Sequence, residues 1–390
     1  MNADAPVLFE ETATASGHRI GIATLNQPAS LNGLSLPMVD LLAEQLDAWE
    51  ADSGIALIML RGAGGKAFCA GGDLHALYRS LGGRRDSVLG IGDSESVVDY
   101  ALAFFSREYR LDYRIHAFPK PVLCWGHGIV MGGGMGLMAG ASHRVVTDAS
   151  RLAMPEIGIG LFPDVGGTWM LSHAPGHSGR FLALTGANLG ASDAIHAGFA
   201  DIAIAQTASD AVFEALVNQA WHGETHSDAA TLHRLLRGFA MQDLEPGPLQ
   251  RFRSVIDACC GTPSLEEAVA ELLACDMDDP WWQRAKAAIA AGCPSSIRLS
   301  WELQQRACRL SLAEVFRLEL NAAMGCATHG DFAEGIRALL IDKDKQPRWN
   351  PATLAQADAA FANAFIERHW PNGHPLADLG RDDPQRTPLH

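Results

Sequence analysis

The 390-residue sequence predicts an α/β core followed by a helical region. Two observations favour this fold class. Strand-like and helix-like segments alternate up to about residue 207, which is the arrangement of an α/β layer structure. After that point the apolar positions follow helical spacing and no strand pattern recurs. We therefore expect an α/β core in residues 1–207, helices packed on it in residues 208–370, and a mobile tail in residues 371–390.

Short apolar runs and helical periodicity alternate in the first half. Strands are predicted at His18 to Leu25, Ile55 to Arg61, Val122 to Trp125 and Arg144 to Thr147. A helix is predicted over Leu36 to Asp52, because apolar residues such as Leu42 and Leu46 fall on one side. A longer helix is predicted over Ser94 to Ala117, where two following prolines end it.

Helical spacing dominates the second half. Helices are predicted at Ala208 to Trp221, Leu265 to Cys275, Trp281 to Ala291, Ser295 to Cys308, Ser311 to Met324 and Asp331 to Leu340. No internal repeat of fixed period is found.

Charge and composition exclude several classes of protein. The chain has 30 basic and 45 acidic residues, a formal net charge of −15, which repels nucleic acid. It has no run of 18 apolar residues and no signal or transit pattern at its start. Its eight cysteines are scattered without a C-x-x-C pair, as in proteins of a reducing compartment. We expect a cytoplasmic protein without nucleic-acid or membrane partners.

A first glycine-rich loop follows the second predicted strand and reads Lys66-Ala67-Phe68-Cys69-Ala70-Gly71-Gly72-Asp73. Small residues let the backbone approach a ligand and leave N–H groups free. Asp73 suits the N-cap of a helix that begins at Leu74. Taken alone, the segment fits a plain strand–turn–helix connection equally well.

A second glycine-rich loop runs from Gly126 to Gly136. Three consecutive glycines before an apolar run predict a helix N-terminus, which favours a developing negative charge. A dinucleotide fingerprint matches formally at Gly134-x-Gly136-x-x-Ala139. We disfavour it, because the preceding strand ends too far back, at Trp125, and no acidic residue follows at the required distance.

Two acids, Glu156 and Asp164, stand in the apolar and glycine-rich stretch from Leu152 to Gly167. Acids in such surroundings lose contact with water, which raises the pKa and suits them to proton transfer. Pro155 and Pro163 precede them and stiffen the backbone. The alternative, a turn residue and a surface residue, is weakened by the apolar neighbours.

These motifs, in this order and spacing, resemble the crotonase (enoyl-CoA hydratase/isomerase) superfamily. GIVMGGGMGL and AMPEIGIGLFPDVGG resemble more narrowly its 3-hydroxyisobutyryl-CoA hydrolase branch. The similarity returns at LTGA and at HGDFAEGIRALLIDKDKQPRWNP, residues 329–351, and spans about residues 7–351. It implies a ββα spiral core and hydrolysis of a short 3-hydroxyacyl-CoA thioester, a step of valine catabolism.

The resemblance also implies residue roles. The amides of Gly72 and Gly133 would form an oxyanion hole for the thioester carbonyl. Glu156 falls on the family's catalytic glutamate, and Asp164 on an aspartate that the hydrolase branch adds. The superfamily commonly holds the adenine and pantetheine of coenzyme A near the first loop, here Lys66, Ala67, Phe68, Ala70, Gly71 and Asp73. No metal is implied, and coenzyme A is part of the substrate rather than a cofactor.

One departure from the hydratases decides between activities. They carry a glutamate two residues after the glycine triplet, where this sequence has Gly136. Hydrolysis is therefore favoured over hydration or isomerisation of an enoyl-CoA, and a non-catalytic acyl-CoA-binding protein is the third alternative. The sequence leaves open whether Glu156 attacks the thioester or activates a water. His127, where relatives carry Asn or Asp, is interpreted as a loop residue and not as the base.

Two further points stay open at this stage. Arg337, Lys343 and Lys345 are candidate partners for the coenzyme A phosphates, but Asp342 and Asp344 alternate with the lysines, as in ordinary solvated charges. Crotonases often form trimers or hexamers, so a homo-oligomer is an option, although a longer helical half could cover the same surface.

Overall fold

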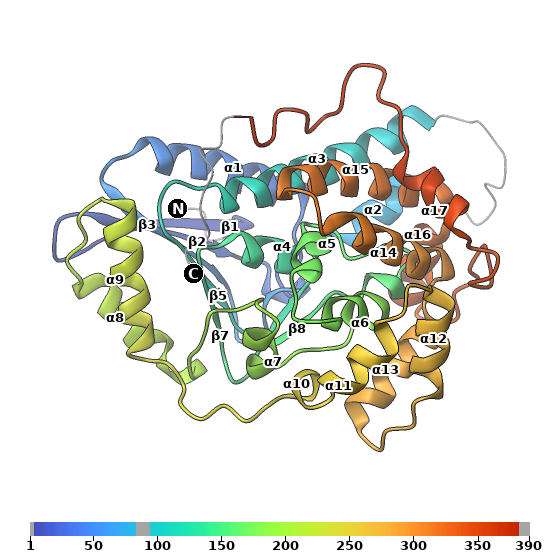
Figure 1. Cartoon of the computed structure of the whole chain (residues 1–390). Coiled ribbons are helices and arrows are strands. Elements are labelled where there is room, and N and C mark those ends of the chain that lie inside the picture. Colours follow the sequence, from blue (N-terminus) through green and yellow to red (C-terminus); the bar gives the residue numbers. More distant parts are fainter. Residues whose placement is uncertain (1–3, 83–93, 382–390) are drawn as a thin grey trace.

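The computed structural model describes residues 4–82 and 94–381. Its core contains a six-stranded sheet, ordered β1-β2-β3-β5-β7-β9, and a three-stranded sheet, ordered β4-β6-β8 (Figure 1). Among the named strands of the described residues, β1 and β2 are the only antiparallel pair. The strands are β1 (Val7–Ala13), β2 (Arg19–Leu25), β3 (Ile55–Gly62), β4 (Ala67–Cys69), β5 (Val122–Gly126), β6 (Ile129–Met131), β7 (His143–Val146), β8 (Arg151–Ala153) and β9 (Ile202–Ala203).

Three times in succession, a strand of the large sheet continues into a strand of the small sheet and then into helix. The three units are β3–β4, β5–β6 and β7–β8, each with the helices that follow it. These helices are α2 (Leu74–Ser80), α3 (Ser94–His116), α4 (Gly133–Gly140), α5 (Gly167–Ser172), α6 (Ser178–Thr185) and α7 (Ala191–His196). The repeated unit confirms the expected ββα spiral core.

The predicted strands form where the sequence has apolar runs. β3 and β5 are buried almost throughout, as expected for parallel strands covered on both faces. The edge strand β1 was not predicted, because it has no buried apolar run: of its seven residues only Val7 is fully buried, and the other six are exposed or partly buried. The predicted helix over residues 36–52 corresponds to α1 (Leu36–Ala51), which buries Leu42, Leu46 and Trp49.

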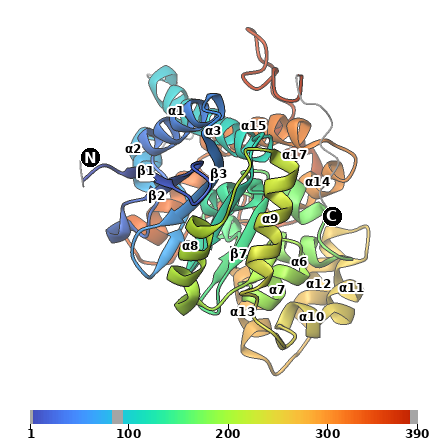
Figure 2. The ribbon, with the colours of Figure 1, turned by 90° about the vertical axis from the view of Figure 1, so that its left-hand side faces the viewer.

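The second half is helical and lies on two sides of the core. Its longer helices are α8 (Ser209–Asn218), α9 (Thr225–Arg237), α11 (Arg253–Cys260), α12 (Leu265–Ala274), α13 (Pro280–Ala291), α14 (Pro294–Ala307), α15 (Leu312–His329) and α17 (Ala359–Ile366). The shorter ones are α10 (Pro248–Arg251) and α16 (Asp331–Ile336). In Figure 2, α8 and α9 cover one face of the large sheet, where Val212, Leu216, Leu232 and Leu236 join its buried apolar residues. None of the helices among the described residues is long and apolar enough to cross a membrane.

The chain after α17 returns over α15 and α3 (Figure 1). There Leu376 is buried, and Arg317 Nη1 donates to the carbonyls of Leu376 (3.3 Å) and Leu379 (3.0 Å). Arg110 Nη2 also binds Asp378 Oδ1 at 2.9 Å. Residues 371–381 thus bury two leucines, Leu376 and Leu379, against the core, while the mobility that we expected from residue 371 stays a prediction. Residues 382–390 of that expected tail lie outside the described residues.

Candidate active site

The small sheet brings the two glycine loops and the first acid together. In this parallel sheet Cys69 pairs with Val130, and Met131 pairs with Ala153. The carboxyl ends of all three strands therefore meet at one edge of the sheet. Gly72, Gly133 and Glu156 follow these strands directly, so chain segments far apart in the sequence converge there.

A pocket of about 790 Å³ opens at this edge, large enough for a drug-sized ligand. Of the candidate site residues named in the sequence, those that line it are Ala70, Gly71, Gly72, Asp73, Gly133, Glu156, Asp164 and Lys343. Three others are not among its lining residues: Lys66 is exposed, and Ala67 and Phe68 are buried in β4. His127 does not line it either; its Nε2 lies 2.9 Å from the Gly64 carbonyl.

The two glycine amides lie close together at the pocket. Gly133 is the first residue of α4, where an N–H group has no partner within the helix. Within the described part of the chain, neither the Gly72 nor the Gly133 N–H donates to another protein group. A Cβ placed on Gly133 would lie 3.6 Å from the Gly72 nitrogen. The two amides can thus serve one acceptor, such as a carbonyl oxygen that gains negative charge.

Gly132 leaves room for the carboxyl group of Glu156 beside the backbone of the second glycine loop. Its φ is +49°, and a Cβ there would lie 3.2 Å from Glu156 Oε1. Glycine is therefore required both by the backbone conformation and by the close approach of the carboxyl group. Glu156 itself is 5% exposed, and its Oε2 has no hydrogen-bond partner within the described residues. Burial raises the pKa of Glu156 well above its usual value, and the neighbouring Asp164 raises it further.

Asp164 is held by a tyrosine and by the turn that follows it. The Tyr109 hydroxyl donates to Asp164 Oδ2 at 2.7 Å. Burial raises the pKa of Asp164 to about 7, although the Tyr109 hydrogen bond acts in the opposite direction. The next residue, Val165, has a φ of +54°, an uncommon and strained conformation for a β-branched residue.

Glu319 of α15 stabilises this strained turn. It is fully buried, and its carboxylate accepts the N–H groups of Gly166 (2.7 Å) and Thr168 (3.0 Å). Burial raises the pKa of Glu319 to about 8. A residue of the helical half, far away in the sequence, therefore orders the backbone next to Asp164.

Two buried acids of α3 were missed by the sequence analysis. Glu108 lines the pocket, and a Cβ on Gly133 would lie 2.4 Å from its Oε1. Asp112, one turn further on, is 2% exposed, and neither of its carboxyl oxygens has a partner within the described residues. Burial raises the pKa of both groups well above the usual value. A signal was present: both acids fall at helical spacing from Phe104, on the apolar face of the predicted helix.

Asp112 also explains the glycine at position 136. A Cβ on Gly136 would lie 2.7 Å from Asp112 Oδ2 and 2.7 Å from the Val165 Cβ. Such contacts are far too short for carbon atoms, so the space that a side chain would need at this position is filled. A carboxyl group reaches this region from α3 instead of from α4.

The chain is similar to known proteins over most of its length. The sequence profile of the family described as enoyl-CoA hydratase/isomerase matches residues 20–366. A mitochondrial 3-hydroxyisobutyryl-CoA hydrolase of Danio rerio is 36% identical to this chain, and the match covers 93% of this chain and 89% of the relative's length. The 3-hydroxyisobutyryl-CoA hydrolase 1 of Arabidopsis thaliana is 32% identical, over 94% of this chain and 93% of its own length.

Solved structures of the same fold carry other names. A carnitinyl-CoA dehydratase from Mycobacterium thermoresistibile is 36% identical, has a TM-score of 0.81 and covers 94% of this chain and 98% of its own. An enoyl-CoA hydratase from Rhodobacter sphaeroides 2.4.1 is 33% identical and has a TM-score of 0.78. The match covers 93% of this chain and 97% of the hydratase chain. Similarity at this level is thus found both to named hydrolases and to named hydratases.

Proposed function

Since the chain belongs to the enoyl-CoA hydratase/isomerase family, we propose that it is an acyl-CoA thioester hydrolase acting on a short 3-hydroxyacyl-CoA of the 3-hydroxyisobutyryl-CoA type. The observation that carries the proposal is the shared pocket, which Glu156 lines together with Gly72 and Gly133, whose amides have no acceptor within the described residues. A glutamate from α4, which a hydratase would place at position 136, has no room beside Asp112 and Val165.

The proposed reaction begins with the thioester oxygen between the two amides. Attack on the carbonyl carbon places negative charge on that oxygen, and each amide donor contributes roughly 3–4 kcal/mol to its stabilisation. In one route a Glu156 oxygen attacks, the C–S bond breaks, coenzyme A leaves as thiolate, and water hydrolyses the mixed anhydride. In the other route Glu156 takes a proton from the attacking water.

Both routes require ionised Glu156, while Asp164 orients the 3-hydroxyl group of the substrate or assists Glu156. The high pKa of Glu156 makes it a stronger base once it is ionised. Asp164, with a pKa of about 7, is close enough to influence Glu156, so the two carboxyl groups titrate as a pair.

Hydration of an enoyl-CoA is the second candidate. Glu108 brings a further carboxyl group to the pocket wall, next to Gly133. The two solved relatives with the names dehydratase and hydratase support the same alternative. The absence of a side chain at Gly136 argues for hydrolysis, since Glu108 enters from a different helix and a different direction.

A substrate panel separates the two candidates. The purified protein is incubated with 3-hydroxyisobutyryl-CoA, 3-hydroxypropionyl-CoA and crotonyl-CoA, while free thiol and enoyl absorbance are followed. We expect thiol release from the hydroxyacyl thioesters and little change with crotonyl-CoA. Loss of the enoyl absorbance without thiol release would instead assign hydration, and no change in either signal would leave a binding protein.

A further inference from the structure

The segment from Arg337 to Arg348 forms one wall at the mouth of the pocket, and we refer to it as the clamp segment. It begins in a π-helical turn, η4 (Arg337–Ile341), which continues α16 and lies against α2. From this segment Leu339, Leu340 and Lys343 line the pocket. The conformation of the clamp segment therefore shapes the entrance to the catalytic groups.

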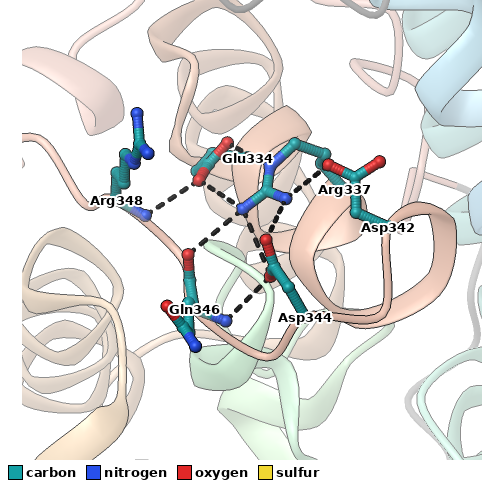
Figure 3. Close-up of polar contacts among 6 residues, drawn as sticks. All are labelled: Glu334, Arg337, Asp342, Asp344, Gln346 and Arg348. Carbon is teal, nitrogen blue, oxygen red and sulfur yellow. Dashed lines mark hydrogen bonds and ion pairs between the residues drawn. The ribbon is translucent and has the colours of Figure 1, made fainter.

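A buried arginine determines that conformation. Arg337 is 4% exposed, and its Nε and Nη2 donate to Glu334 at 2.8 and 2.9 Å. Its Nη1 donates to Asp342 (2.6 Å) and Asp344 (2.7 Å), and its Nη2 also reaches the Gln346 carbonyl (3.1 Å). Figure 3 shows these groups gathered around the guanidinium. Arg337 is therefore occupied by the protein itself and is not available to a phosphate.

This arrangement separates the acids of the clamp segment from its lysines. Asp342 and Asp344 turn inward to Arg337 (Figure 3), and Asp344 also accepts the Gln346 N–H at 2.9 Å. The lysines that alternate with them, Lys343 and Lys345, are exposed, and both have a φ of +56°. Only Lys343 is among the residues that line the pocket. The two aspartates thus pair with Arg337, and the two lysines that alternate with them extend to the surface.

The charge of the pocket makes Lys343 distinctive. The acids that line it are Asp73, Glu108, Glu156 and Asp164. Among the lining residues that the structure describes, Lys343 is the only lysine or arginine, and His75 is the only other side chain that can become cationic. An acyl-CoA carries several negative charges on its phosphates, and the chain as a whole carries −15. Binding such a ligand here requires local positive charge near the entrance.

We propose that Lys343 is the phosphate subsite of this pocket and binds a phosphate of the coenzyme A moiety, while the clamp around Arg337 holds it there. The proposal rests on the proposed acyl-CoA substrate. It assigns the lysine to the part of the ligand remote from the reacting carbonyl, because Lys343 stands at the exposed mouth and Glu156 is buried. The ammonium group therefore contributes to affinity for coenzyme A and not to the chemical step.

The test compares Lys343→Ala with Lys345→Ala by titration calorimetry with free coenzyme A. The two lysines share the segment, the charge, the exposure and the backbone conformation, so Lys345→Ala is a matched control. We expect Lys343→Ala to raise the Kd for coenzyme A roughly tenfold, as for one exposed charge-assisted contact. Lys345→Ala should change it less than about twofold, and neither variant should change the Kd for pantetheine, which lacks phosphate.

The same titration with 3′-dephospho-coenzyme A identifies the phosphate. If the effect of Lys343→Ala disappears, the lysine binds the 3′-phosphate; if the effect persists, it binds the diphosphate. Equal effects of the two substitutions, or an equal loss of pantetheine binding, would overturn the proposal. Free coenzyme A carries no acyl group, so failure of the proposed hydrolysis would appear in the substrate panel and leave this binding result unchanged.

Discussion

At the scale of single residues, the glycine at position 136 is explained by its neighbours. Asp112 and Val165 occupy the volume into which a side chain on α4 would project. We predict that Gly136→Ala lowers the free energy of unfolding by about 1–3 kcal/mol through overpacking. We also expect Gly136→Glu to create no hydration of crotonyl-CoA. Urea denaturation and the enoyl absorbance are the measurements.

Two further variants sharpen this prediction. Gly158→Ala is the control, because a Cβ at that position would meet no atom within 4 Å, and we expect little loss of stability. Combining Gly136→Ala with Asp112→Ala should cost less than the sum of the single changes, because the second substitution makes room for the first. Strictly additive losses would show that crowding by Asp112 is not the reason for the glycine.

At the scale of elements, helix α15 controls the turn that carries Asp164. Glu319 accepts two backbone N–H groups of that turn, and an amide in its place would set an NH₂ group against one of them. We predict that Glu319→Gln lowers the free energy of unfolding by about 1–3 kcal/mol and also lowers kcat, because Val165 and Asp164 lose their support. Urea denaturation and steady-state kinetics below the unfolding transition measure the two effects.

The same substitution at the start of α15 provides the comparison. Glu314 is exposed and completes a capping box with Ser311, a role that glutamine also fills. Glu314→Gln should therefore leave kcat unchanged and alter stability only slightly. If Glu319→Gln lowered stability but left kcat at the wild-type value, α15 would support the fold without positioning Asp164.

The extent to which the sequence predicted these elements differs between the core and the site. Buried strands and the glycine loops could be located because their apolar runs and glycines are local signals, and α4 and α2 begin where the sequence predicts. Helical spacing from Phe104 indicates that Glu108 is buried, but no local signal assigns Glu108 or Glu319 to the site. Their roles depend on helix packing between distant segments, and on a helix an acid is ordinarily a solvated residue. The ion pairs of Arg337 could not be predicted either, because its partners Asp342 and Asp344 look like exposed charges in the sequence.

At the scale of the whole molecule, several buried carboxyl groups lie in one pocket or in the layer of residues next to it. Glu108, Asp112, Glu156, Asp164 and Glu319 all have a raised pKa, with burial as the largest cause. A carboxyl group with a raised pKa binds more protons in the folded than in the unfolded state, so folding stability falls as the pH rises through the folded pKa. The values of about 7 for Asp164 and about 8 for Glu319 place part of this loss near neutral pH.

We therefore predict that the midpoint temperature of thermal unfolding decreases as the pH is raised from 6.5 to 8. Buried histidines act in the opposite direction, but only at lower pH. Burial lowers the pKa of His143 to about 4, so its effect on stability is complete above its unfolded value of 6.5. Thermal unfolding followed by circular dichroism across this range measures the trend, and Glu319→Gln should reduce its slope. A midpoint that rose over the same interval would contradict the assignment of these carboxyl groups as buried acids.

The central claim is that Glu156, in one pocket with the amides of Gly72 and Gly133, cleaves the thioester. The most direct test measures thiol release from 3-hydroxyisobutyryl-CoA by the wild type and by Glu156→Gln, with binding of the same thioester followed in the variant. Loss of general-base action alone costs roughly 10²–10⁴-fold in rate. We predict at least this loss in kcat with the Kd for the thioester kept within a few-fold. Near-normal turnover by Glu156→Gln would contradict the claim.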